Sequence, residues 1–252
     1  MYLCCVISKG KIKELSEYKK KKRCDEEHVF IAEGVKICQE ALAAGLSVRV
    51  ICATDLWFSQ HRQLPPEAEL HEVTAEALER LSSLKTPNEV WMLVERPQHS
   101  HFSIDNSQLI LALDKIQDPG NLGTLIRTAD WFGIRCIVCS PDTVSCYNPK
   151  VVQATMGSLF RTEVVYTDLP NWLATCGLPV SGALLDGSSV WSMERPAGKA
   201  VLVIGNESQG ISPAVQECLT HRIAIPNPGG TAESLNAGIA CAILTDELLR
   251  HP

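Results

Sequence analysis

The sequence predicts an α/β protein in which a small α/β domain precedes a larger domain built on a parallel sheet. Apolar runs of strand length alternate with helix-like segments along the chain. In the second half several of these runs are apolar throughout, which is typical of parallel strands covered by helices on both faces. A chain of 252 residues, 45% of them hydrophobic, can bury two modest cores. We therefore predict two domains.

The first domain is assigned to residues 1–95, and a linker is assigned to 96–107. The linker, "RPQHSHFSIDNS", lacks periodicity and contains a proline. His99 and His101 lie in it, and a solvated pair is commoner in such a place than a metal site. The elements expected before it are strands at 28–33, 47–54 and 89–95 and helices at 34–45 and 74–81.

The second domain is assigned to residues 108–252. Ligands of parallel α/β sheets bind beyond the carboxyl ends of the strands. The loops that follow residues 113, 205 and 226 are therefore the candidate functional loops. The expected strands are 109–113, 134–140, 180–185, 200–205 and 222–226.

Charge is distributed unevenly along the chain. Residues 9–23 carry eight basic side chains against Glu14 and Glu17, so this segment is +6 while the whole chain is -6. A basic segment on an acidic body can bind phosphate groups, and a solvated helix face is the alternative that the charge run leaves open. The candidate phosphate-binding residues are Lys19, Lys20, Lys21, Lys22 and Arg23.

Eleven cysteines with irregular spacing do not form a disulfide framework. No secretory signal and no apolar run of about 20 residues is found, so we expect a cytoplasmic protein with reduced thiols and no membrane span. Cys136 and Cys139 form a CxxC in a predicted strand, where residues three apart point to opposite faces. Neither a redox pair nor a metal site is expected.

The loop after residue 113 reads "DKIQDPGNLGTLIR". We expect Asn121 to cap a helix beginning at Leu122. Arg127 lies off the buried stripe of that helix and could clamp a phosphate, or it could be a surface arginine paired with a carboxylate. The GxxG spacing fits neither a dinucleotide-binding loop nor a nucleoside triphosphatase loop.

The two later loops read "GNESQGIS" and "IPNPGGTAESLNAGIA". Gly205 permits a close approach of the backbone, Asn206 supplies a donor and an acceptor, and Glu207 is a candidate base or orienting carboxylate. The register of the first loop does not match the GxSxG of serine hydrolases. In the second loop, Ser234 and Asn236 are polar residues ahead of a helix of small and apolar residues.

Together, "NLGTLIRTAD", "GNESQGIS" and "IPNPGGTAESLNAGIA" resemble the three motifs of the SpoU (TrmH) family of RNA ribose methyltransferases. The segment "FIAEGVKICQEAL" resembles the RNA substrate-binding domain of that family. The resemblance implies a SPOUT α/β domain with a deep trefoil knot and a homodimer. It also implies that the cofactor is S-adenosylmethionine, bound around Gly205, Asn206, Ile225 and Leu235.

By the same resemblance the catalytic residues are Arg127, Asn121, Glu207, Ser234 and Asn236. We expect Arg127 to bind the adjacent phosphate and the developing oxyanion, while Glu207 or water takes the proton. Asn227 departs from the motif, because family members often have methionine there. The favoured substrate is ribosomal RNA, with transfer RNA next. Two different classes of protein stay open, a non-catalytic RNA-binding relative and a small-molecule methyltransferase.

Overall fold

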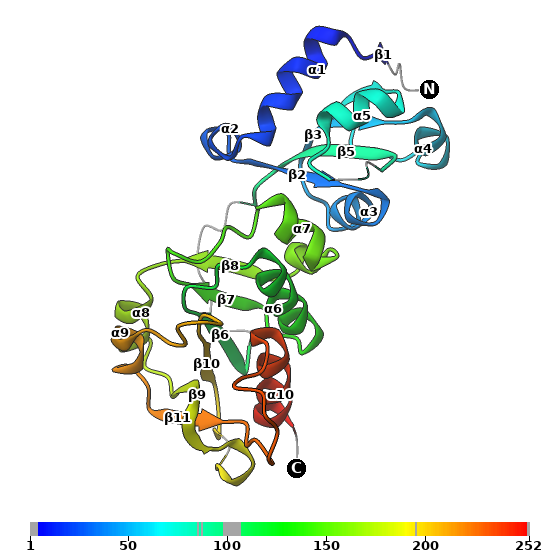
Figure 1. The fold of residues 1–252 in the computed structure, drawn as a ribbon. Coiled ribbons are helices and arrows are strands. Elements are labelled where there is room, and N and C mark those ends of the chain that lie inside the picture. Colours follow the sequence, from blue (N-terminus) through cyan, green and yellow to red (C-terminus); the bar gives the residue numbers. More distant parts are fainter. Residues whose placement is uncertain (1–4, 85, 87, 98–106, 195, 251–252) are drawn as a thin grey trace. The chain divides into compact units, whose positions relative to one another are not determined.

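The computed structural model describes residues 5–84, 86, 88–97, 107–194 and 196–250. Its internal contacts divide the chain into two units, and Figure 1 shows both. The first unit comprises residues 1–100 and 147–160, and the second comprises residues 101–146 and 161–252. The α/β class predicted from the sequence is confirmed for both.

The first unit is built on a five-stranded mixed sheet of order β1-β4-β3-β5-β2. Strand β5 is antiparallel to β2 and β3, and the other pairs are parallel. The strands are β1 (Cys5–Val6), β2 (Val29–Glu33), β3 (Val48–Ala53), β4 (Glu69–Glu72) and β5 (Val90–Glu95). The helices are α1 (Lys9–Ser16), η1 (Glu17–Lys19), α2 (Lys21–Glu26), α3 (Val35–Ala43), α4 (Asp55–Gln60) and α5 (Ala75–Leu81).

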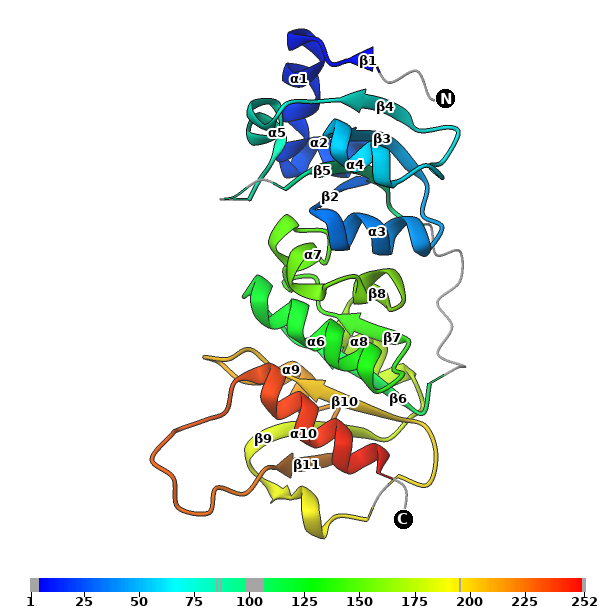
Figure 2. The same cartoon turned by 90° about the vertical axis from the view of Figure 1, so that its right-hand side faces the viewer.

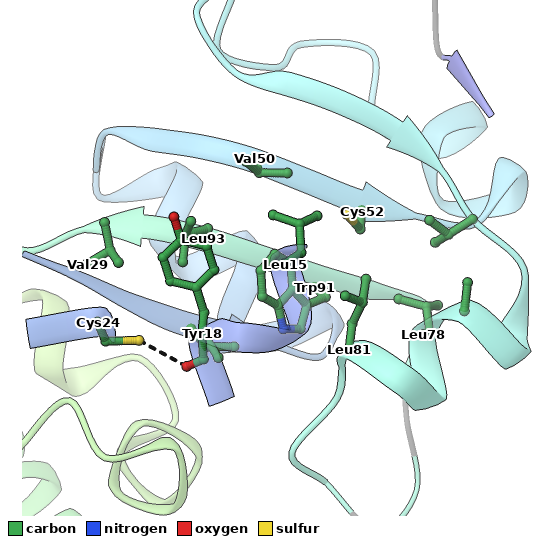
Figure 3. Packing of buried hydrophobic residues seen from close by; sticks show 13 residues of the cluster. Leu15, Tyr18, Cys24, Val29, Val50, Cys52, Leu78, Leu81, Trp91 and Leu93 are labelled. Carbon is green, nitrogen blue, oxygen red and sulfur yellow. Dashed lines mark hydrogen bonds between the residues drawn. The ribbon is translucent and has the colours of Figure 1, made fainter. Parts of the chain in front are cut away.

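The core of this unit lies between the sheet and the helices α1, α2 and α5. Figure 3 shows Leu15, Leu78 and Leu81 directed toward side chains of β3 and β5. Trp91 and Leu93 are almost completely buried in the same cluster. The Cys24 thiol donates a hydrogen bond to the Tyr18 carbonyl at 3.1 Å, which links the end of η1 to α2. The basic segment is thus part of a packed layer.

Residues 147–160 belong to the first unit although they lie within the sequence range assigned to the second domain. This segment contains α7 (Pro149–Thr155) and η2 (Ser158–Phe160). The ring of Phe30 lies 5.1 Å from that of Tyr147 and 5.9 Å from that of Phe160, measured between centroids. Gln153 donates a hydrogen bond from Nε2 to the Glu33 carbonyl at 2.6 Å. Aromatic packing and a polar anchor therefore attach the segment to β2.

Glu33 is a buried carboxyl group, only 3% exposed, at the end of β2. Its side chain accepts hydrogen bonds from the Ser82 hydroxyl and from the Ser83 amide. Burial raises the pKa of Glu33 above its ordinary value of 4.5, against the opposing effect of these donors. The folded state therefore binds this proton more tightly than the unfolded state does.

Because the pKa of Glu33 is raised in the folded state, its stabilising effect is complete below about pH 4.5 and is lost as the pH rises through the folded-state pKa. We expect Glu33→Gln to gain stability relative to wild type as the pH increases from about 4 to about 8. Urea unfolding of both proteins across this range measures the effect. A constant difference between them would contradict the prediction.

The second unit contains a six-stranded, wholly parallel sheet of order β11-β9-β10-β6-β7-β8. Figures 1 and 2 show α6 and α10 on one face and α8 and α9 on the other. The strands are β6 (Leu109–Leu113), β7 (Cys136–Cys139), β8 (Glu163–Tyr166), β9 (Val180–Ser189), β10 (Ala200–Ile204) and β11 (His221–Ala224). The helices are α6 (Pro119–Trp131), α8 (Leu169–Thr175), η3 (Val190–Ser192), α9 (Pro213–Gln216) and α10 (Ala237–Leu249).

The parallel sheet confirms the prediction made from the apolar runs. Strands β6 and β10 are direct neighbours, and Leu113 pairs with Ile204 at their carboxyl ends. Helices on both faces bury β6, β7 and β10 completely, which explains their uniformly apolar sequences. The loops that follow β6 and β10 therefore leave the sheet side by side.

Other expectations concern thiols, metals and membranes. Burial raises the pKa of the Cys136 thiol to about 12 and that of Cys139 well above its ordinary value. Within the described ranges, no group of three His, Cys, Asp or Glu side chains could hold a metal ion. No helix formed by these residues is long and apolar enough to cross a membrane. His99 and His101 lie outside the described residues.

Candidate active site

The first loop enters helix α6 earlier than predicted. The helix begins at Pro119, and Asp118 is its N-cap, with Oδ1 accepting from the Asn121 amide at 2.8 Å. The prediction that Asn121 caps a helix starting at Leu122 is therefore wrong. Proline is favoured at the first position of a helix because its φ already has the helical value. Asp118, the residue before it, is the N-cap. The side chain of Asn121 is left available for other contacts.

Asn121 joins all three candidate loops. Its Nδ2 donates to Glu207 Oε1 at 2.6 Å, and its Oδ1 accepts from Asn236 Nδ2 at 2.8 Å. Asn236 is also the N-cap of α10, because its Oδ1 accepts from the amides of Gly238 and Ile239. The structure thus brings together three polar residues that are 86 and 115 positions apart in the chain.

Asn206 shapes the loop that carries Glu207. Its Oδ1 accepts from the amides of Ser208 and Gln209, at 2.9 and 3.1 Å. Its Nδ2 donates to the carbonyl of Lys115 at 2.8 Å. Lys115 has a φ of 56°, a left-handed conformation that non-glycine residues rarely adopt. Asn206 therefore fixes its own turn and attaches that turn to the loop after β6.

Gly205 lies where the same loop folds back on itself. A Cβ atom at this position would lie 2.4 Å from the carbonyl carbon of Gly210 and from the nitrogen of Ile211. The buried carboxylate of Asp114 accepts from the Ser212 amide at 2.7 Å and so holds the far end of the loop against the end of β6. Only glycine at position 205 permits this close approach of two backbone segments.

Arg127 and Ser234 are not part of this hydrogen-bonded cluster. Both are exposed, and neither forms a hydrogen bond or ion pair with any described residue. Arg127 is six residues after Asn121 in α6, so its Cα lies about 9 Å further along the helix axis. Among the described residues it has no carboxylate partner, in contrast to the surface ion pair that the sequence left open. The guanidinium is therefore available to bind an anion.

The third loop connects β11 to α10, and residues 227–236 are all exposed. Asn227 organises its first part. The Oδ1 of Asn227 accepts from the amides of Gly229 and Gly230, and its Nδ2 donates to the carbonyls of Gly230 and Ala232. Here an asparagine side chain closes the turn by hydrogen bonds.

The residues around this loop fit a cofactor that is held through backbone groups. The peptide groups of Gly205, Ile225 and Leu235 make no hydrogen bond to any other residue of the described ranges. The Leu235 side chain is 48% exposed and could cover an apolar part of a ligand. Free backbone donors and acceptors beside exposed apolar surface suit the adenosine and methionine parts of S-adenosylmethionine.

Replacing Asn227 by alanine should remove the four hydrogen bonds of this turn and leave the loop less ordered. We expect the dissociation constant for S-adenosylmethionine to rise about tenfold, because the ordering of the loop must then occur on binding. Calorimetric titration measures it. Asn171→Ala is a matched control, since Asn171 lies in the first turn of α8, outside the three candidate loops. Equal affinity of the Asn227 variant and wild type would contradict the prediction.

The end of the basic segment, residues 19–23, lies in the first unit, on η1 and α2. Three cations of these five residues are paired on the surface: Lys20 with Glu17, Lys22 with Glu26 and Arg23 with Glu27. Lys19 and Lys21 are exposed and have no ion pair with a described residue. The segment therefore offers fewer free cations than its sequence suggests.

Comparison with known proteins matches both units to protein families. A model of the SpoU rRNA methylase family matches residues 108–246, more than half of the chain. The chain belongs to the SpoU rRNA methylase family. Residues 9–91 match the MRM3-like substrate binding domain, which confirms the resemblance of the first domain to an RNA substrate-binding domain.

Similar proteins cover nearly all of this SpoU-family chain. The Bacillus subtilis 23S rRNA (guanosine(2553)-2'-O)-methyltransferase RlmP is 29% identical over 94% of the chain and 95% of its own length. A Porphyromonas gingivalis structure described as an RNA methyltransferase of the TrmH family is 36% identical, with a TM-score of 0.87 and coverage of 98% and 99%. An AdoMet-bound rRNA methyltransferase from Sinorhizobium meliloti is 27% identical, with a TM-score of 0.86 and coverage of 98% and 97%.

Proposed function

We propose that this protein transfers a methyl group from S-adenosylmethionine to a ribose 2′-hydroxyl of ribosomal RNA. The observation that carries the proposal is the hydrogen-bonded cluster of Asn121, Glu207 and Asn236, which joins the three motif loops at one edge of the parallel sheet. RlmP and the AdoMet-bound relative support the same reaction and cofactor. The intact cluster argues against a non-catalytic relative. The substrate-binding domain argues against a small-molecule substrate.

The cofactor would be held by the backbone around Gly205, Asn206, Ile225 and Leu235, and it supplies an electrophilic methyl group when bound. A ribose hydroxyl is a very weak acid, so the enzyme has to stabilise the negative charge that develops on its oxygen. The unpaired guanidinium of Arg127 suits this task and can also bind the adjacent phosphate. Ser234, exposed beside the cofactor loop, would donate a hydrogen bond to the RNA.

Calorimetric titration of S-adenosylmethionine into wild type and into Leu235→Arg tests the proposal. The arginine side chain should fill the cofactor site, so binding should be lost while the circular dichroism spectrum stays unchanged. Unmodified ribosomal and transfer RNAs are then compared as methyl acceptors. If wild type bound no cofactor, even with RNA present, the protein would be an RNA-binding relative without this activity.

The basic segment of the first unit is proposed to bind RNA phosphates. Within residues 19–23, Lys19 and Lys21 have no ion pair with a described residue, and Lys20, Lys22 and Arg23 would have to exchange a carboxylate for a phosphate. Exposed ion pairs are weak, so this exchange costs about 1 kcal/mol or less for each pair.

We expect the double variant Lys19→Gln, Lys21→Gln to weaken RNA binding and to flatten its salt dependence. Each lost phosphate contact lowers the slope of log K against log salt by about 0.7 to 0.9. Filter binding of ribosomal RNA at several salt concentrations measures the slope, with Lys199→Gln in the second unit as the control. If the slope of log K against log salt did not change, these lysines would not contact RNA, and the segment would be a solvated helix face.

A homodimer is also proposed, with α6 and α10 at its interface. These helices lie side by side on one face of the sheet (Figure 2). Trp131 is 85% exposed on α6, and Ile239 is 53% exposed on α10. Exposed large apolar side chains on adjacent helices are typical of a contact surface between subunits. Sedimentation of wild type and Trp131→Glu would test the dimer.

The trefoil knot and the cytoplasmic location stay proposals. The knot is supported by the match of residues 108–246 to the SpoU rRNA methylase family, whose resemblance implied it. The cytoplasm is supported by the free thiols among the described residues, which include Cys24, Cys38, Cys136, Cys139, Cys176, Cys218 and Cys241.

A further inference from the structure

The hydrogen bonds of the active-site cluster run in one direction only. The amides of Gly238 and Ile239 can only donate, and they point at Asn236 Oδ1, at 2.9 and 3.4 Å. This fixes which end of the Asn236 amide is oxygen, so its Nδ2 must face Asn121. Since Nδ2 can only donate, the atom of Asn121 that meets it must be the carbonyl oxygen.

The same logic continues to Glu207. With Oδ1 turned toward Asn236, the Nδ2 of Asn121 faces Glu207 and donates to Oε1 at 2.6 Å. Oε1 therefore acts as the acceptor, and Oε2 is left outside the chain of bonds. The first turn of α10 thus determines the orientation of a carboxyl group on another loop.

Close packing of α10 against α6 holds Asn121 and Asn236 in the positions that these hydrogen bonds require. A Cβ atom at Gly238 would lie 2.6 Å from Thr124 Cγ2, so the start of α10 lies directly against α6. On the α6 side, the Asn121 amide is tied to Asp118 at 2.8 Å. Both asparagines are therefore fixed through their backbones as well as through their side chains.

We propose that Glu207 is the catalytic base of the methyl transfer, and that Asn121 and Asn236 are positioning residues that orient its carboxyl group and leave Oε2 free to accept the proton. As the 2′-oxygen forms its bond to the methyl carbon, the carbon–sulfur bond breaks and its electron pair stays on sulfur. The hydroxyl proton goes to Glu207 Oε2. The positive sulfonium and the negative carboxylate become a neutral sulfide and a neutral carboxylic acid, so atoms and charge balance.

This inference rests on the proposed function and goes beyond it by assigning the proton. In this scheme the guanidinium of Arg127 is not the base. It binds the developing oxyanion and the adjacent phosphate. Besides Glu207 itself, the titratable groups on the surrounding loops are Asp114, Lys115, Asp118 and Glu233, and Arg127 lies further along α6. Asn121 is the described residue whose hydrogen bond to the Glu207 side chain is observed.

The test is the pH profile of single-turnover methyl transfer to unmodified ribosomal RNA by Asn121→Asp. This variant keeps an acceptor for Asn236 but replaces the donor to Glu207 with a second carboxyl group. Two carboxylates so close cannot both ionise readily, so one of them retains a proton to higher pH. We expect the acid limb of the profile to move up by about 2 to 4 pH units, with the rate recovering at high pH.

A second variant covers the case in which Asn121→Asp does not fold. Asn236→Asp keeps the cap of α10, because a carboxylate oxygen accepts from the same two amides, but it loses the donor to Asn121. We expect kcat to fall at least tenfold, with the affinity for S-adenosylmethionine unchanged. Asn148→Asp is the matched control, since Asn148 caps α7 by accepting from the Lys150 amide and belongs to no such chain.

The outcomes separate this inference from the proposed function. If wild type methylates RNA but the acid limb of Asn121→Asp stays in place, or if Asn236→Asp keeps the full kcat, Glu207 is not the base held by this chain. If wild type transfers no methyl group to any RNA, the proposed function itself fails.

Discussion

Replacing Arg127 by alanine should lower the rate of methyl transfer by about 10² to 10³-fold, while S-adenosylmethionine still binds. Losing one preorganised donor to a developing oxyanion has an effect of this size. Cofactor binding should persist because Arg127 lies on α6, about two helical turns beyond Asn121, and not on the cofactor loops. Single-turnover transfer and calorimetric binding measure the two quantities separately.

Two further variants sharpen the interpretation of Arg127. Arg222→Ala is the control, since Arg222 is an exposed arginine of the same unit that pairs with Asp186, and it should leave the rate unchanged. Arg127→Lys tests the role of the proton. If the lysine variant kept most of the rate and gained a new low-pH limb as the lysine titrated, arginine would be the base and Glu207 would not.

Gly205→Ala should destabilise the second unit by about 3 kcal/mol and abolish cofactor binding. The added Cβ would meet backbone atoms of Gly210 and Ile211 at 2.4 to 2.5 Å, and backbone cannot move aside as a flexible side chain can. The turn held by Asn206 and the position of Glu207 would change with it. Thermal unfolding and calorimetric titration of the variant measure both effects.

Gly198→Ala is the matched control for this substitution, because a Cβ atom there meets nothing within 4 Å. It should unfold at the wild-type temperature and bind the cofactor normally. Wild-type stability of Gly205→Ala would show that the loop can relax, and the close approach of the two backbone segments would then not constrain position 205.

The sequence predicted the architecture well where side-chain periodicity reports burial. The fully buried strands β6 and β10 appear as uninterrupted apolar runs, and β2, β3 and β5 were found within two residues of their observed bounds. Strand β4, "ELHE", was missed because only one of its four residues is buried, so no apolar pattern marks it. Strand β8 was missed because its side chains are only partly buried.

The candidate site was only partly predictable. The three loops could be selected because they follow parallel strands, but the bonds of Asn121 to Glu207 and Asn236 depend on tertiary packing. Asp118 could have been found, since an aspartate before a proline is a common helix start. Nothing local signals the left-handed conformation of Lys115, which Asn206 supports from another loop.

The course of the chain limits how such a protein can be recombined in evolution. It passes between the two units three times, because residues 147–160 return to the first unit before β8 begins. A single crossover between residues 96 and 107 would give a hybrid in which Phe30 met a Tyr147 and a Phe160 inherited from another lineage. The substrate-binding unit and this inner segment must therefore be inherited together, and new RNA targets would arise more readily by substitution than by exchange of the domain.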